Sequence, residues 1–150
     1  MLRCARQGMG VNMKADKTRI KSYLTDIKKN SRELNQLIDN HELESESLSL
    51  KAAKYLLIEL AEAMANSIQH VLAKEYGITV SGYIDSIVKA NQNGIISQDL
   101  FQQLKPFFDF RNSLIHRYWS IDDDILVVNL YTGRNDFNRF VQELEQHLDI

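Results

Sequence analysis

Cysteine, proline and glycine are all scarce in this chain, and each scarcity argues against a class of fold. The single cysteine, Cys4, cannot form a disulfide within the chain, and no Cys or His residues have the spacing of a zinc site. One proline and six glycines in 150 residues disfavour a β-sandwich built on many tight turns and favour long helices. We therefore expect an all-α protein without a structural metal or an internal disulfide.

Long apolar runs and an excess of one charge are also missing. No run approaches the roughly 18 apolar residues that a membrane span needs. Residues 1–12 contain two arginines but no apolar stretch behind them, so we do not expect a signal peptide. A net charge of −2 argues against a protein that coats nucleic acid but leaves room for a local basic site. These features predict a cytoplasmic domain that does not engage membranes.

The chain does contain enough apolar sequence, 44% of its residues, to bury the core of one domain. Residues 1–12 lack periodicity and are expected to form a disordered leader, whereas residues 13–150 are expected to form a single helical domain. Apolar side chains recur there at three- and four-residue steps, which predicts a bundle of about five to six helices. The expected helices cover about 14–40, a stretch from near Ser45 or Ser47 to about residue 75, a short segment capped by Ser81, a segment capped by Ser97, 122–130 and 137–148.

Pro106 falls inside the helical pattern that follows Ser97. Proline removes one backbone donor and disfavours helix at the residue before it. We expect either a kink near Gln103 or a fresh helix with Pro106 in its first turn.

One arginine lies on a helical face whose other residues are apolar and are expected to be buried. In the segment after Pro106, the helical steps that place phenylalanine and leucine on one face also place Arg111 there. A buried, unpaired guanidinium is costly, so it needs a carboxylate, an interface or a ligand. Glu62, on a polar strip of the 47–75 helix, is one candidate partner. The plainer alternative is a structural ion pair, or an arginine that reaches water at a helix end.

His116 stands close to Arg111 in sequence, and Asn112 lies on the same helical face as the histidine. On an unbroken helix, Arg111 and His116 point about 140° apart, so one straight helix cannot aim both at one atom. Either the helix ends close to His116, or two copies of the motif in a symmetric dimer build one site. Three further basic residues are candidates for a rim around it: Lys105, Arg134 and Arg139.

The string Arg111-Asn112-Ser113-Leu114-Ile115-His116-Arg117-Tyr118 resembles the RX4HXY signature of the HEPN superfamily, and most closely its HepT toxin branch. The surrounding sequence strengthens the resemblance: FFDFRN leads into the motif, GIIS opens the preceding helix, an acidic ID segment follows, and the second helix reads LAEAMANSIQH. The similarity covers roughly residues 51–148.

This resemblance implies a helical-bundle ribonuclease that forms a homodimer, with its active cleft where the two RX4HXY motifs meet. It makes Arg111 and His116 catalytic. It also implies a partner, an MNT-type nucleotidyltransferase antitoxin, which transfers AMP from ATP to the motif tyrosine, Tyr118. The residues expected to bind the substrate are Asn112, Arg117, Glu62 and Asn66; Asn66 stands where many relatives have an aspartate.

The side chains suit RNA cleavage without a metal or a cofactor. RNA carries its own nucleophile, the 2′-OH beside the scissile phosphate, and a histidine with a pKa near neutrality can take or donate the proton. An arginine can stabilise charge on the phosphoryl oxygens. The RNA substrate is left open between tRNA and mRNA. Two alternatives also stay open: a non-catalytic HEPN dimer acting as a nucleotide- or partner-binding scaffold, and a plain helical adaptor.

Overall fold

The structure, a computed structural model, describes residues 14–116 and 120–150, and all regular secondary structure in these ranges is helical. Six helices follow one another there: α2 (Lys17–Asp39), α3 (Leu48–Tyr76), α4 (Tyr83–Gln92), α5 (Gln98–His116), α6 (Asp123–Gly133) and α7 (Asp136–Leu148). No helix in the described ranges is both long and apolar enough to cross a membrane. The predicted all-α bundle is confirmed, while the predicted leader, residues 1–12, lies outside the described residues.

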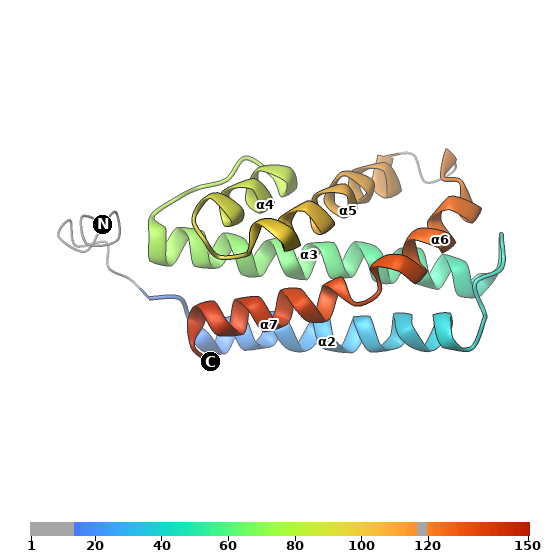
Figure 1. Ribbon diagram of the computed structural model, residues 1–150, viewed down its shortest axis with the longest axis horizontal. Helices are drawn as coiled ribbons and strands as arrows, with labels where there is room; N and C mark the ends of the chain where they lie inside the picture. The colour runs from blue at the N-terminus through green and yellow to red at the C-terminus, as the bar shows by residue number, and fades with distance from the viewer. Residues whose placement is uncertain (1–13, 117–119) are drawn as a thin grey trace.

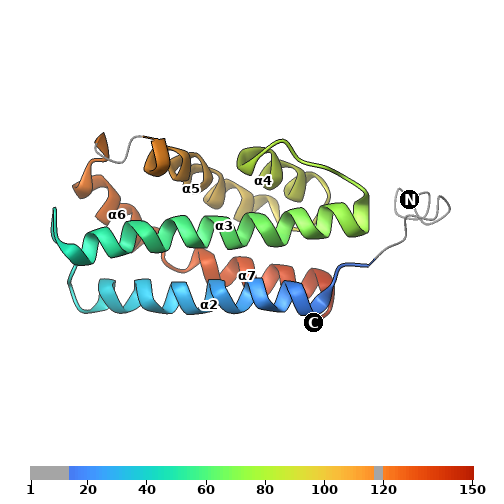
Figure 2. The ribbon, with the colours of Figure 1, turned by 180° about the vertical axis from the view of Figure 1, so that it is seen from behind.

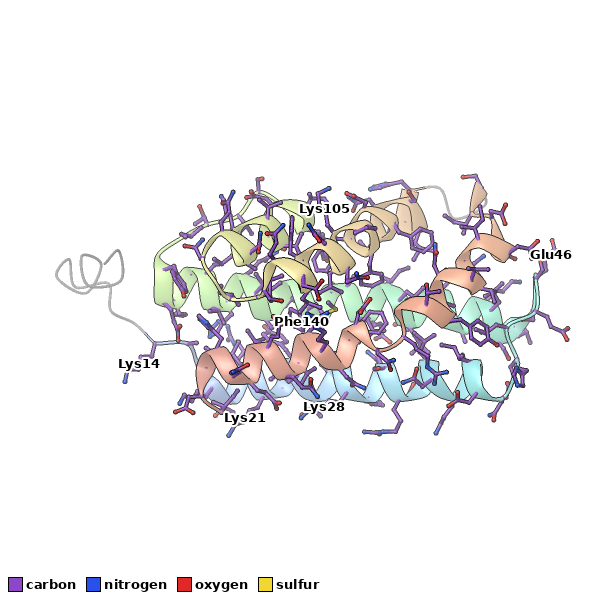
Figure 3. All side chains as sticks on the ribbon, in the orientation of Figure 1. Lys14, Lys21, Lys28, Glu46, Lys105 and Phe140 are labelled. Atoms are coloured by element: carbon purple, nitrogen blue, oxygen red, sulfur yellow. The ribbon has the colours of Figure 1, made fainter. Side chains whose placement is uncertain are left out.

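The two longest helices, α2 and α3, form the spine of the bundle. They lie side by side along the long axis of the molecule, with α7 against α2 and with α4 and α5 against α3 (Figures 1 and 2). The core lies between these helices. Phe140 points into it from α7 and is fully buried, whereas Lys21, Lys28 and Lys105 point outward (Figure 3). Apolar stripes on every helix therefore meet in one core, as the periodicity predicts.

Helix ends follow the predicted caps with one exception. The hydroxyl of Ser47 accepts a hydrogen bond from the Leu50 amide at 3.0 Å, and that of Ser97 accepts one from the Leu100 amide at 3.1 Å. The expected Ser81 cap is wrong, because Gly82 is the N-cap residue of α4. Ser81 instead donates its backbone N–H to the Asp85 carboxylate at 2.9 Å, so a side chain from the first turn of α4 accepts a hydrogen bond from the segment that precedes the helix.

Helix α5 continues through Pro106, so the expected fresh helix at the proline is wrong. Proline leaves only the carbonyl of Gln102 without its intrahelical donor, and Gln102 is exposed to water that can solvate it. Leu104 and Phe108, on either side of the proline, are almost completely buried in the same core. Packing on both sides of Pro106 thus holds the two halves of α5 together.

The beginning of α6 is tied to α3 and to the loop before it through Asp123. Its carboxylate accepts hydrogen bonds from Lys54 Nζ at 2.8 Å, from the Ser45 hydroxyl at 3.2 Å and from the Glu46 amide at 3.1 Å. The hydrogen bond from Lys54 is the main reason that the pKa of Asp123 lies below its ordinary value, and burial opposes it. Both side chains are largely buried, so this pair fixes the first turn of α6 against α3.

We expect Asp123→Asn to lower the free energy of unfolding at neutral pH by about 3 kcal/mol, because it removes a largely buried carboxylate charge that accepts hydrogen bonds from Lys54, Ser45 and Glu46. The stability that the ionised Asp123 contributes is fully present above the unfolded pKa of about 3.9 and is lost as the pH falls through the lower folded pKa. Urea unfolding followed by circular dichroism across this pH range measures the difference, which should shrink in acid.

Asp109→Asn is the matched control, because Asp109 pairs with Lys105 on the surface. Its removal should leave the free energy of unfolding nearly unchanged. Equal sensitivity of the two variants, or a difference that ignores pH, would contradict the anchoring role of Asp123.

Candidate active site

Arg111 lies on α5 and stacks on an aromatic ring of α4. Its guanidinium carbon, Cζ, is 3.6 Å from the centroid of the Tyr83 ring. Helices α4 and α5 are joined by the short segment 93–97 and pack against each other, which brings the first residue of α4 beside the last turns of α5. At this separation the positive charge faces the negative π-face of the ring, so the contact is a cation–π interaction.

The edge of the same guanidinium makes one described hydrogen bond. Arg111 Nη1 donates to the Asn112 side-chain oxygen at 3.1 Å, while Nε is buried and has no hydrogen-bond partner among the described residues. Glu62, the carboxylate suggested by the sequence, is exposed on α3, and no ion pair within the described ranges joins it to Arg111. The aromatic ring of Tyr83 takes the place that the sequence offered to a carboxylate.

The three basic residues that the sequence offered for a rim all have carboxylate partners. Lys105 pairs with Asp109 at 3.1 Å, Arg134 with Asp39 at 2.8 Å and Arg139 with Asp99 at 2.6 Å. The expected basic rim is therefore largely neutralised by intramolecular ion pairs. Arg111 differs from these three side chains, because within the described residues no carboxylate neutralises it.

His116 is the last residue of α5 and is exposed to solvent. Whether Arg111 and His116 converge through a helix end or through a second copy of the motif stays a prediction. The structure describes no direct contact between Arg111, which faces α4, and His116. Asn66 is exposed on α3, and Arg117 and Tyr118 lie outside the described residues.

A separate concavity of about 310 Å³ opens between α5, α6 and α7. Its walls are mainly apolar and include Phe107 and Phe137, whose rings meet edge to face with centroids 5.2 Å apart. Asp136 lines it as well, and burial raises the pKa of this carboxyl group. The concavity extends to Phe110, the residue before Arg111, but neither Arg111 nor His116 lines it.

Sequence reasoning did not identify Tyr83 as part of the site. In the sequence it stands four residues before Ile87, the ordinary spacing of side chains that pack on one helix face. The only signal was indirect: Arg111 on a face with buried neighbours requires some partner. Which residue supplies that partner depends on how α4 and α5 pack, and this is a tertiary property.

Known proteins resemble this chain in sequence and in structure. A candidate RNase of Archaeoglobus fulgidus is 28% identical over 94 residues, which make up 63% of this chain and 70% of that protein. A tri-AMPylated HEPN toxin of Shewanella oneidensis, solved in complex with an MNT antitoxin, has a TM-score of 0.77 at 21% identity, covering 85% of this chain and 97% of that one. The cytosolic protein YutE of Bacillus subtilis, whose function is unknown, has a TM-score of 0.79 at 15% identity, covering 91% and 93%.

At these identities the two solved structures show a shared fold, and the predicted HEPN-like architecture is confirmed. The sequence itself matches the family described as HepT-like, Ribonuclease HepT-like, over residues 20–144. Because this match includes the packed helices and the motif segment, the chain belongs to the HepT-like ribonuclease family.

Proposed function

We propose that this protein is the toxin of a toxin–antitoxin system and a metal-independent ribonuclease whose catalytic side chains are Arg111 and His116. The observation that carries the proposal is the Arg111 guanidinium, stacked on Tyr83 without a described carboxylate partner. Arg111 belongs to an RX4HXY motif whose histidine, His116, is exposed. The chain as a whole belongs to the HepT-like ribonuclease family. A purely structural arginine is normally neutralised, as Arg134 and Arg139 are.

The reaction needs only these side chains and the RNA itself. The 2′-oxygen attacks the adjacent phosphorus as His116 removes the 2′-OH proton, and the bond to the 5′-oxygen breaks as that oxygen receives a proton. The products are a 2′,3′-cyclic phosphate and a 5′-hydroxyl. Arg111 stabilises the charge that develops on the phosphoryl oxygens. The side chains of Asn112, Arg117, Glu62 and Asn66 contact the substrate, which is tRNA or mRNA.

A second copy of this chain completes the site in this proposal. The large apolar side chains exposed in the described residues all come from α3, α5 and α6: Leu48, Tyr55, Ile115, Ile125, Val128 and Tyr131. Figure 1 shows that the start of α3, the end of α5 and all of α6 lie at the same end of the bundle. A symmetric dimer through this end of the bundle buries the exposed apolar surface and brings the two motifs together. One histidine then acts as the base and the other as the acid.

The proposed partner is an MNT-type nucleotidyltransferase antitoxin that modifies Tyr118. The phenolic oxygen of Tyr118 attacks the α-phosphorus of ATP, and pyrophosphate leaves. The resulting AMP group adds bulk and negative charge beside the motif, so it blocks RNA and repels its backbone. Support comes from the Shewanella oneidensis HEPN toxin, which shares the fold and is AMPylated in its complex with an MNT antitoxin.

We expect the purified chain to cleave RNA in the presence of EDTA. His116→Ala should slow cleavage about 10²- to 10⁴-fold, because it removes the proton-transfer group. Arg111→Ala should slow it about 10²- to 10³-fold through lost charge stabilisation. Labelled tRNA and an mRNA transcript serve as substrates, and gel electrophoresis with end-group analysis measures the products.

The matched control is Arg32→Ala, which removes an exposed arginine of α2 and should keep full activity. A folded wild type that cuts neither RNA would favour the scaffold alternative.

Coexpression with the MNT-type antitoxin should add adenylyl groups to the toxin, measurable as intact-mass increments. Tyr118→Phe should abolish the increment, because phenylalanine lacks the attacking oxygen. The modified toxin should no longer cleave RNA. Neutralisation of the toxin with an unchanged mass would reject modification as the route of inhibition.

The molar mass of the isolated chain in solution should be twice the 17.4 kDa of one chain. Ile115→Lys, beside His116, should shift it towards the monomer and reduce cleavage, because it places a charge on the proposed interface. Analytical ultracentrifugation measures the mass, and circular dichroism checks that the helices persist. Ser22→Lys on the exposed side of α2 adds the same charge elsewhere and should stay dimeric. A monomeric, active wild type would contradict the shared site, and a chain that dimerises only with the antitoxin would assign this face to that partner.

A further inference from the structure

The residues of the RX4HXY motif leave one feature of the site without a role, the aromatic ring on which its arginine rests. Tyr83 belongs to α4 and lies outside the motif in sequence, yet its ring centroid is only 3.6 Å from Arg111 Cζ. Tyr83 is itself partly buried against the core, so its ring is supported from behind by the bundle. The guanidinium thus rests on a surface that the fold holds in place.

Two contacts restrict the guanidinium in different ways. Stacking on Tyr83 sets the plane of the group, and the hydrogen bond from Nη1 to Asn112 limits its rotation within that plane. An arginine side chain otherwise has many rotamers, and ordering it at the moment of reaction carries an entropic cost. Together the two contacts orient the charged group before substrate arrives.

An aromatic partner differs from a carboxylate in what it leaves available. A carboxylate would neutralise the positive charge and occupy the N–H groups along the guanidinium edge. The ring contacts only the face, so the charge persists and the N–H groups of Nη2 have no described partner. A bidentate contact to two phosphoryl oxygens uses one N–H from each of two guanidinium nitrogens, and Nη2 contributes to both edges that can make it. The ring therefore holds the arginine without competing with a phosphate.

We propose that Tyr83 is the positioning residue for Arg111, holding the guanidinium by its face so that its edge is free to bind the scissile phosphate. This inference rests on the proposed ribonuclease function. The part of Tyr83 that matters is its ring, not its hydroxyl group.

Steady-state cleavage of labelled RNA by the full-length chain tests the proposal. Tyr83→Leu should lower kcat about 10- to 100-fold with a much smaller change in KM, since a displaced catalytic group loses transition-state stabilisation. Tyr83→Phe should retain activity within about twofold, because phenylalanine keeps the π-face. Tyr23→Leu is the matched control: Tyr23 is a half-buried tyrosine of α2 packed against the same core, and its loss should not change kcat. Full activity of a folded Tyr83→Leu variant would overturn the proposal.

A double-mutant cycle separates positioning from general destabilisation. In single-turnover assays Tyr83→Leu should have no further effect once Arg111 is alanine, because the residue it positions is gone. Independent, multiplying losses would overturn the proposal. If the wild type cleaves no RNA, the proposed function and this inference both fail. If the wild type cleaves and Arg111→Ala does not, yet Tyr83→Leu is unimpaired, only this inference fails.

A spectroscopic measurement checks the contact without reference to activity. The ring current of Tyr83 should shift the Arg111 side-chain NMR resonances upfield in the wild type and in Tyr83→Phe, and the shift should disappear in Tyr83→Leu. Arg111 resonances at ordinary positions in the folded wild type would show that the stack is absent in solution, and would overturn the proposal.

Discussion

A positive charge held against the face of a tyrosine ring is the interaction on which the candidate site depends. Arg111 emerges from a helix whose neighbouring residues enter the core, so its guanidinium is partly removed from water. A charge in that position normally takes a carboxylate partner. Here the described partners are the ring of Tyr83 and the amide of Asn112, and both leave the charge intact. The fold thereby stabilises a cation while keeping it available to an anionic ligand.

The packing of the other helices holds Arg111 and Tyr83 in position for this contact. Leu104 and Phe108 anchor α5 to the core on both sides of Pro106, so the helix reaches the motif unbroken. The short segment 93–97 connects α4 to α5, so the two helices pack against each other and Tyr83 lies beside Arg111. Beyond the motif, Lys54 and Asp123 fix the start of α6. The site therefore has rigid elements on each side of the motif, which is what preorganised electrostatic stabilisation requires.

The two ends of the bundle also differ in what they leave exposed. Ion pairs neutralise charged side chains on the surface, including Arg134 and Arg139. The end that carries His116 instead exposes apolar side chains from three helices, among them Leu48, which is 82% exposed. Exposed apolar surface beside the motif is what a site completed by another polypeptide chain requires. Family membership, fold and surface composition thus support the same proposal.

Much of this protein was readable from the sequence, because helix periodicity and capping are local. Ser47 and Ser97 cap the helices they precede, and the motif at Arg111 and His116 identified the family. Other outcomes needed the tertiary structure. Pro106 lies within one continuous helix because core packing on both sides outweighs one lost hydrogen bond, and sequence pattern alone does not weigh these terms. The partner of Arg111 is Tyr83 rather than Glu62, since the packing of α4 on α5 decides which side chain meets the guanidinium.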